Sequence, residues 1–196
     1  MKKRYGISIL PFQVTLGGKS YTSRVDFDNA QFFRLIVQYD EIPKTTQITP
    51  FEFQEIYLRE VKTGVRDLIL VLINSKVSST YNNSVMAVNL FFKEHPEYKS
   101  SFRVHSIDGM GHNALNGEPV VQAAEMRENG TGVGEIVSYL KDILPRREIY
   151  FGIYDLKDAA KSGRIPTAAC LGTKLNLKPS MKIFDNSITA AAKCRG

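Results

Sequence analysis

The apolar and polar positions of the chain change character most sharply around residues 68–92. Leu68–Ile73 is an unbroken apolar run of strand length, a pattern typical of a parallel strand that is buried on both faces. A polar, hydroxyl-rich stretch follows, and apolar positions then return at helical spacing until Pro96. These helical positions are Tyr81, Val85, Val88 and Phe92. The pattern predicts a strand, a loop and a helix.

The loop of this unit is a candidate ligand site. In open parallel sheets, ligands bind at the carboxyl ends of strands, where loop hydroxyls and free helix amides converge on anions. Residues 74–80 carry several such hydroxyls. The alternative interpretation is that these serine and threonine residues only cap the following helix. Both interpretations stay open on this pattern alone.

The segments before this unit predict two short extended pieces and two helices. Residues 7–16 and 19–25 favour strands on either side of a Gly-Gly turn, and residues 28–39 favour a helix capped by Asp28 with Gln31. A polar connector, residues 44–48, leads to a capping box at Thr49 and a helix that ends at Gly64. The connector therefore places Thr45 and Thr46 just ahead of a helix N-terminus, where unpaired amides favour an anion.

The segments after this unit alternate strands with helices. Residues 102–106 favour a strand, residues 108–113 a glycine-containing loop, and residues 118–129 and 134–144 helices. This alternation predicts an α/β fold with a mainly parallel sheet flanked by helices. We place a domain boundary at Pro145, which gives an N-terminal α/β domain, 1–145, and a partial second α/β domain, 146–196. The second domain is expected to contain a strand at 149–153, helices at 156–161 and 167–175, and a hairpin around Asp185-Asn186.

Composition narrows the class of protein further. No stretch reaches the ~20 consecutive apolar residues of an integral membrane segment, and the N-terminus does not resemble a secretion signal, so we expect a cytoplasmic protein. The two cysteines, Cys170 and Cys194, lack metal-ligand spacing and are expected to stay reduced, with Cys170 in the core.

The net charge of +6 is unevenly distributed. The segment Leu156–Gly196 has eight basic residues and two acidic ones, so it carries the whole excess. These charges lack interleaved aromatic residues and a binding motif, which argues against nucleic acid as a partner and favours an anionic ligand or an acidic protein face.

Catalytic patterns are weak. The chain has no Gly-x-Ser-x-Gly motif and few histidines, and the Gly109-Met110-Gly111 stretch fits neither a Rossmann nor a Walker pattern. We therefore predict no catalytic residue, no metal and no cofactor. A phosphate-binding or kinase-associated module of the same α/β kind remains the alternative function.

Five short motifs, taken in order, resemble the DegV family of fatty-acid-binding proteins. They are residues 9–14 (Ile-Leu-Pro-Phe-Gln-Val), 44–47 (Lys-Thr-Thr-Gln), 77–81 (Val-Ser-Ser-Thr-Tyr), 161–165 (Lys-Ser-Gly-Arg-Ile) and 176–179 (Asn-Leu-Lys-Pro). The resemblance implies a two-domain, cytoplasmic bacterial protein, without catalytic activity of its own. It also implies that the protein holds a long-chain fatty acid such as palmitate between its domains, and in some members presents it to a fatty acid kinase subunit.

The resemblance also implies which residues contact the carboxylate. The family's Thr-Ser-Gln motif falls on Thr45, Thr46 and Gln47, and its first threonine, a carboxylate contact, matches Thr45. The family's Leu-Ser-Gly-Thr-Tyr motif falls on residues 77–81, and its carboxylate-binding serine matches Ser78. Ser79 stands where the family has glycine, so we expect it to strain the turn or obstruct the ligand. Arg164 matches the arginine of the Lys-Gly-Gly-Arg-Ile motif and is expected to face the acid or its phosphate, although Ser162 replaces the first glycine.

The family's opening strand and the last part of its second domain have no counterpart in the sequence. That last part carries a histidine near the carboxylate, and the chain's own histidines, His95, His105 and His112, are expected in loops or on the surface. A truncated relic without ligand binding is therefore a further alternative. We expect unpaired sheet edges and an uncovered face to make the isolated chain marginally stable or to make it associate.

Overall fold

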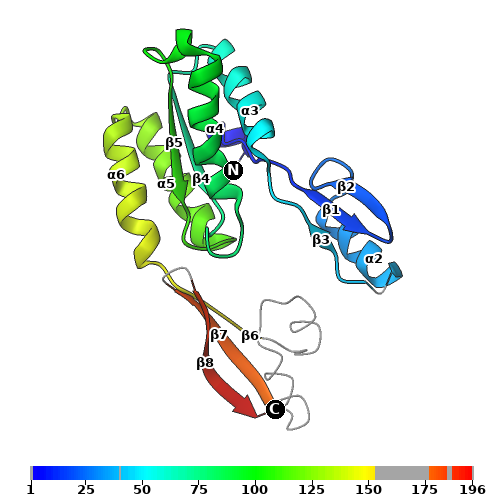
Figure 1. The fold of residues 1–196 in the computed structure, drawn as a ribbon. Helices are drawn as coiled ribbons and strands as arrows, with labels where there is room; N and C mark the ends of the chain where they lie inside the picture. The colour runs from blue at the N-terminus through cyan, green and yellow to red at the C-terminus, as the bar shows by residue number, and fades with distance from the viewer. Residues whose placement is uncertain (1, 40, 153–176, 185–186, 196) are drawn as a thin grey trace. The chain divides into compact units, whose positions relative to one another are not determined.

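The computed structural model describes residues 2–39, 41–152, 177–184 and 187–195 (Figure 1). The helices are α1 (Lys2–Tyr5), α2 (Asn29–Tyr39), α3 (Pro50–Lys62), α4 (Thr80–Glu94), α5 (Ala114–Glu128) and α6 (Val133–Ile143), with 3-10 turns η1 (Pro96–Tyr98) and η2 (Leu144–Arg146). The strands are β1 (Gln13–Leu16), β2 (Lys19–Thr22), β3 (Lys44–Thr45), β4 (Asp67–Leu72), β5 (Arg103–Asp108), β6 (Ile149–Gly152), β7 (Leu177–Phe184) and β8 (Ser187–Arg195).

The structure contains helices together with parallel and antiparallel strand pairs, which confirms the α/β class. Strands β4 and β5 form the predicted parallel pair, in which Leu70 lies opposite Ser106. The pairs β1–β2, β1–β3 and β6–β7 are antiparallel. An isolated parallel bridge also joins Ser23 and Phe27. The sheets have the strand orders β2-β1-β3, β4-β5 and β6-β7-β8.

The chain divides into two compact units. The first contains Met1–Ile9, Gln47–Glu148 and Phe184–Asn186, and the second contains Leu10–Thr46, Ile149–Ile183 and Ser187–Gly196. The segment that carries β1, β2, α2 and β3 thus belongs with the later strands. The division of the sequence into domains 1–145 and 146–196 stays a prediction.

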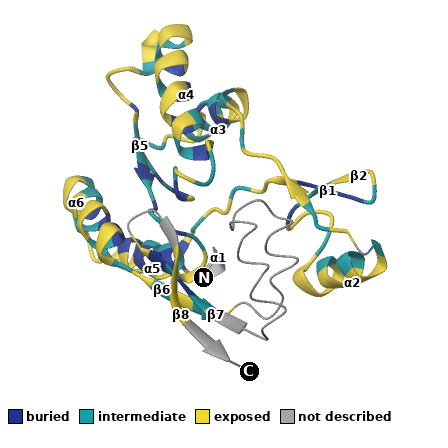
Figure 2. Ribbon diagram, turned by 60° about the horizontal axis from the view of Figure 1, so that its bottom comes forward, coloured by how far each residue is buried: buried dark blue, intermediate teal, exposed yellow. Residues whose placement is uncertain are grey.

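The β4–β5 pair is covered by helices on both faces (Figure 1). Alternate strand residues face a core cluster on the α5 and α6 side, where Ile69 and Val71 pack against buried apolar side chains. The opposite face meets α3 and α4, which supply buried aromatic rings. The α5–α6 cluster is Ile107, Ala123, Ile136, Leu140 and Leu144, and the aromatic cluster is Phe53, Tyr57, Phe91 and Phe102. Figure 2 shows that the exposed positions lie along the outer sides of these helices.

Two predicted helix starts have the predicted caps. The Thr49 side chain accepts a hydrogen bond from the Glu52 amide (3.2 Å), and the Glu52 carboxylate accepts one from the Thr49 amide (2.7 Å). The side chains of Asp28 and Gln31 pair in the same reciprocal way at the start of α2. Such caps use only neighbouring residues, so the sequence is sufficient to place them.

Several predicted boundaries were wrong. Strand β1 begins at Gln13 rather than at residue 7, and β2 ends at Thr22, whose carbonyl accepts from the amides of Val25 and Asp26 in a turn. The connector 44–48 contains the short strand β3. Helix α5 starts at Ala114, four residues before the predicted start, because buried Pro119 lies inside the helix rather than at its first turn.

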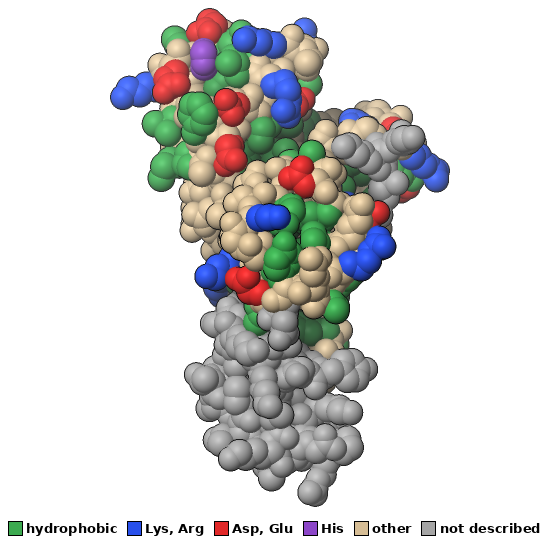
Figure 3. Space-filling view, turned by 90° about the vertical axis from the view of Figure 1, so that its right-hand side faces the viewer, with side chains coloured by type: hydrophobic (Ala, Val, Ile, Leu, Met, Phe, Trp, Pro, Cys, Tyr) green, Lys and Arg blue, Asp and Glu red, His purple; other side chains and the backbone are tan. Residues whose placement is uncertain are grey.

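The apolar face of α2 differs from that of a core helix. No residue of this helix is buried, and Phe33 and Val37 are largely exposed. Figure 3 shows the molecule from the right-hand side of Figure 1, and on that side apolar side chains lie beside charged ones. The predicted helices at 156–161 and 167–175, together with Arg164 and Cys170, lie outside the described residues. The predicted hairpin strands are confirmed as neighbours β7 and β8.

Candidate functional site

Asn74 is the anchor of the loop that joins β4 to α4. Its side chain is completely buried, and its Oδ1 accepts a hydrogen bond from the Lys76 amide (2.8 Å). Its backbone amide donates to the Gly111 carbonyl (3.1 Å), and its Nδ2 lies 3.5 Å from the Met110 carbonyl. Asn74 therefore fixes the loop after β4 to the loop after β5, through its backbone amide and its side chain.

Asp108, the last residue of β5, ties the same two loops from the other side. Its Oδ1 accepts hydrogen bonds from the amides of Ser75 (3.2 Å) and Met110 (3.0 Å), and such contacts stabilise a carboxylate. The loops after the two parallel strands thus form one cluster at the carboxyl ends of the strands, where ligand sites of open sheets occur.

Gly109 allows the β5 loop to lie this close. Its amide donates to the Leu72 carbonyl (2.8 Å), and a Cβ on this residue would lie only 2.4 Å from that oxygen and 2.2 Å from Asn116 Nδ2. The close approach requires a residue without a side chain.

Ser78 lies at the start of α4, half-buried. Its amide donates to the Asn74 carbonyl (3.2 Å), and its Oγ accepts from the Thr80 amide at 3.3 Å and lies 2.9 Å from Thr80 Oγ1. Ser78 therefore does what the capping interpretation expects. A hydroxyl group can also accept and donate at once, so this role is compatible with binding a carboxylate.

Ser79 does not strain the turn. Its φ is −75° and its ψ is 2°, which is ordinary backbone for any residue, and its side chain is exposed. Its carbonyl accepts from the Asn83 amide (2.8 Å) as part of the first helical turn. The expectation that serine would strain this position in place of glycine was wrong.

Thr45 and Thr46 are exposed and belong to the second compact unit, whereas Ser78 and Ser79 belong to the first. Thr45 pairs with Val14 in the β1–β3 ladder, and the Thr46 amide donates to the Gln13 carbonyl (3.1 Å). Backbone pairing thus fixes the positions of both threonines and leaves their hydroxyls on the surface.

The buried face of α4 lies one residue away from the predicted face. The buried positions are Thr80, Ser84, Ala87 and Phe91, rather than Tyr81, Val85, Val88 and Phe92. The prediction followed the larger apolar residues, but small hydroxyl-bearing side chains face the sheet here. The spacing of residues 80, 84, 87 and 91 is itself helical, so a search for small residues at that period would have found this face.

A row of hydrogen-bonded hydroxyls from buried Tyr57 and Ser84 and half-buried Ser106 explains how serine is tolerated on that face. Tyr57 Oη donates to the Ser84 carbonyl (3.0 Å) and lies 2.8 Å from Ser84 Oγ, which in turn lies 2.6 Å from Ser106 Oγ. Burial raises the pKa of the Tyr57 hydroxyl, so Tyr57 keeps its proton. These hydrogen bonds satisfy polar atoms of three elements, α3, α4 and β5.

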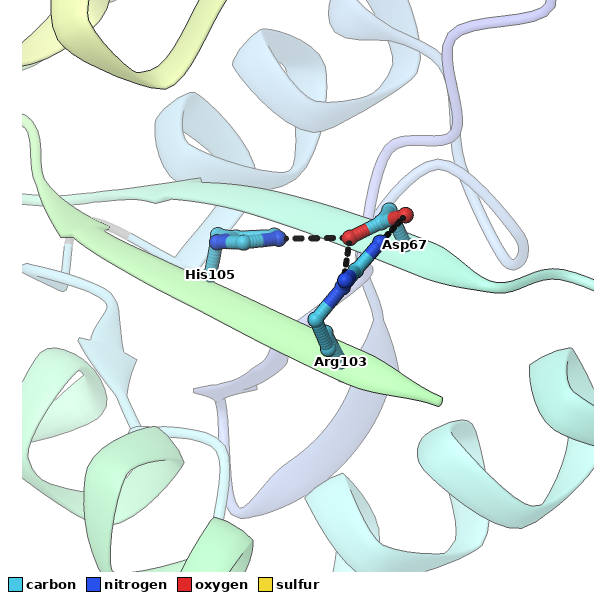
Figure 4. Close-up of polar contacts among 3 residues, drawn as sticks. All are labelled: Asp67, Arg103 and His105. Atoms are coloured by element: carbon cyan, nitrogen blue, oxygen red, sulfur yellow. Dashed lines mark hydrogen bonds and ion pairs between the residues drawn. The ribbon is translucent and has the colours of Figure 1, made fainter. Parts of the chain in front are cut away.

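A second polar cluster lies at the opposite, amino ends of β4 and β5. Asp67 accepts from Arg103 Nε (2.7 Å) and Nη2 (2.8 Å), and His105 Nε2 lies 2.9 Å from the same carboxylate (Figure 4). The contacts from Arg103, with a further contribution from His105, lower the pKa of Asp67 to about 2. His105 was expected in a loop or on the surface, but it lies in β5 and is partly buried. This arrangement is an ion-pair cluster that joins two strands.

Comparisons with known proteins place the chain in a family. The model of the DegV family of uncharacterised proteins matches residues 1–196. The chain belongs to the DegV family. A DegV domain-containing protein of Caldanaerobacter subterraneus is 30% identical over 195 residues, which are 99% of this chain and 66% of that protein.

Solved DegV structures have the same fold. One is a fatty-acid-binding DegV family protein from Thermus thermophilus. The two structures match with a TM-score of 0.81 at 27% sequence identity, and the match covers 100% of this chain and 67% of the Thermus chain. The fatty acid kinase B3 protein of Streptococcus pneumoniae, loaded with linoleic acid, has a TM-score of 0.77 at 18% identity, with 95% of this chain and 64% of that chain covered. This DegV chain thus spans about two thirds of the length of the relatives that it matches.

Among the described residues, no helix combines the length and apolar character needed to cross a membrane. The named relatives are bacterial proteins.

Proposed function

We propose that this DegV chain is a cytoplasmic, non-catalytic protein that binds a long-chain fatty acid and presents its carboxylate to a fatty acid kinase. Thr45, Thr46, Ser78 and Ser79 provide the carboxylate contacts, together with Arg164, which lies outside the described residues. The observation that carries the proposal is the position of Ser78, half-buried at the start of α4, on a loop fixed by Asn74.

The chemistry of Ser78 and α4 suits a carboxylate. The first amides of an α-helix have no partner within the helix, and its N-terminus carries a partial positive charge. Hydrogen bonds to a charged ligand group contribute about 1.5 to 3 kcal/mol each. The two loops that surround this helix start are fixed to one another, so these donors do not have to be ordered when the ligand binds.

The acyl chain supplies the larger part of the binding free energy. Each methylene group removed from water contributes about 0.8 kcal/mol, so a chain of fatty acid length outweighs the polar contacts. Two structural relatives support this assignment. The Thermus thermophilus protein binds fatty acid, and a protein from Eubacterium ventriosum binds stearic acid. Palmitate is a ligand of this class.

Native mass spectrometry of the purified chain, with fatty acid analysis of its organic extract, tests the proposal without a choice of ligand. Stoichiometric C14 to C18 fatty acid is the expected result. A folded chain that carries no lipid and does not bind added palmitate would overturn it. A chain that instead binds inorganic phosphate tightly would favour the phosphate-binding module, which the same helix start could also support.

A further inference from the structure

We propose that Thr80 is a positioning residue for the carboxylate site, because its buried hydroxyl donates to Ser78 Oγ and thereby directs the Ser78 proton toward the ligand. This inference rests on the proposed function. It adds a residue that acts through Ser78, and Thr80 itself does not touch the ligand.

The first support is the geometry of the pair. Thr80 is 7% exposed, whereas Ser78 is half-buried. The two hydroxyl oxygens lie 2.9 Å apart, and the Thr80 amide lies 3.3 Å from Ser78 Oγ. Thr80 therefore contacts Ser78 through both its backbone and its side chain, from the side of the protein interior.

The number of protons on the two hydroxyls also favours donation from Thr80 to Ser78. A hydroxyl has one proton and two lone pairs, so Ser78 Oγ, which already accepts from the Thr80 amide, has one lone pair and one proton left. If Ser78 donated to Thr80 Oγ1, only a lone pair would remain for an outside group, and a carboxylate would be repelled. If Thr80 donates, the Ser78 proton is free for a carboxylate oxygen. A carboxylate offers only acceptors, so its binding selects the second arrangement.

The third support is the absence of competition for the Thr80 proton. Within the described part of the chain, Thr80 Oγ1 has Ser78 Oγ as its hydrogen-bond partner and no other. Thr80 is β-branched and lies in the first turn of α4, which restricts its χ1 angle. Its hydroxyl thus holds Ser78 Oγ in one orientation, and a donor that accepts a hydrogen bond itself is polarised into a stronger donor.

The experiment compares Thr80→Val with Thr80→Ser in the full chain, with palmitate and its neutral analogue 1-hexadecanol as probes in a fluorescence displacement assay. Valine keeps the shape of threonine and removes the hydroxyl, so palmitate affinity should fall roughly three- to tenfold, as expected for one hydrogen bond. Hexadecanol affinity should stay within about twofold, because an alcohol does not depend on a directed donor. Thr80→Ser, which keeps the hydroxyl, should restore palmitate affinity.

A Ser78→Ala background separates positioning from packing. If Thr80 acts through Ser78, Thr80→Val should change palmitate affinity little once Ser78 has lost its hydroxyl. Thermal melting verifies that each variant folds, and Thr80→Ala replaces the valine variant if valine prevents folding.

Equal losses for palmitate and hexadecanol, or an unchanged palmitate affinity in a folded Thr80→Val variant, would overturn the role of Thr80 while leaving the proposed function intact. A wild-type chain that binds neither probe would overturn the proposed function itself, and the role of Thr80 with it.

Discussion

Ser84 Oγ on α4 lies 2.6 Å from Ser106 Oγ on β5, and this contact joins a helix to the parallel sheet through two hydroxyls. Tyr57 completes the chain from α3 by donating to the Ser84 carbonyl. Since Tyr57 has a single proton, the remaining contacts run from Ser84 to Tyr57 Oη and from Ser106 to Ser84. Such a satisfied network stabilises one packing of the three elements, because a missing member leaves a buried polar group unpaired.

We expect Tyr57→Phe to lower the free energy of unfolding by about 1 to 3 kcal/mol, because Ser84 then loses a buried partner. Urea unfolding followed by circular dichroism measures the loss. Tyr98→Phe is the matched control, since the Tyr98 ring also packs against Phe91 but its hydroxyl makes no hydrogen bond to the described residues. Equal effects of the two substitutions would contradict a role for the hydroxyl chain.

Asp67 should make stability depend on pH in the acid range. Its native pKa of about 2 lies below the ordinary value of 3.8, so the folded state binds this proton more weakly than the unfolded state. The contribution is therefore fully present above pH 3.8 and is lost as the pH falls toward 2.

Asp67→Asn should accordingly cost about 1 to 2 kcal/mol at pH 7, after allowance for solvent around the exposed Arg103 side chain. Urea titrations of both proteins between pH 7 and the acid range should show the difference shrinking toward pH 2. Asp142→Asn removes an exposed ion pair with Arg146 and should cost less than about 0.5 kcal/mol. A difference that does not change with pH would show that the Asp67 charge is not responsible.

Ser78→Ala should weaken palmitate binding by about 1 to 3 kcal/mol, because it removes a donor to a charged group. Titration with a fluorescent fatty acid measures this. The substitution also removes the acceptor for the Thr80 amide, which should lower stability by about 1 kcal/mol. Ser101→Ala, at an exposed serine after η1, is the control. Unchanged palmitate affinity would rule out Ser78 as a carboxylate contact.

Gly109→Ala should destabilise the loop cluster by roughly 1 to 3 kcal/mol, since the new methyl group would collide with the Leu72 carbonyl and force the backbone to move. The control is Gly117→Ala in α5, where a Cβ meets no atom within 4 Å. Alanine there should raise stability by about 0.5 to 1 kcal/mol through its higher helix propensity. Thermal unfolding of the two variants should shift in opposite directions, and a stable Gly109→Ala protein would show that the loops adapt.

The sequence alone determined the features that depend on neighbouring residues. The capping pairs Thr49–Glu52 and Asp28–Gln31 lie where their spacing predicts them, because a cap is made within one helical turn. The apolar run 68–73 became β4 with one residue of shift, and its parallel pairing with β5 followed from the alternation of elements. The ordered motifs led to the correct family, since they extend along the whole chain.

Only the tertiary structure decided the features that depend on partners distant in sequence. On α4 the small Ser84 is buried and the apolar Val85 is exposed. Ser84 can be buried because its hydroxyl forms hydrogen bonds with Tyr57 and Ser106. The strained turn expected at Ser79 is absent, because the backbone there is already helical in φ. The register of β4 and β5 places Asp67 beside Arg103, so a histidine expected on the surface became part of an ion-pair cluster. The periodicity of apolar residues predicts which faces a helix could bury. The residues that pack against the helix in the folded protein decide which face is buried.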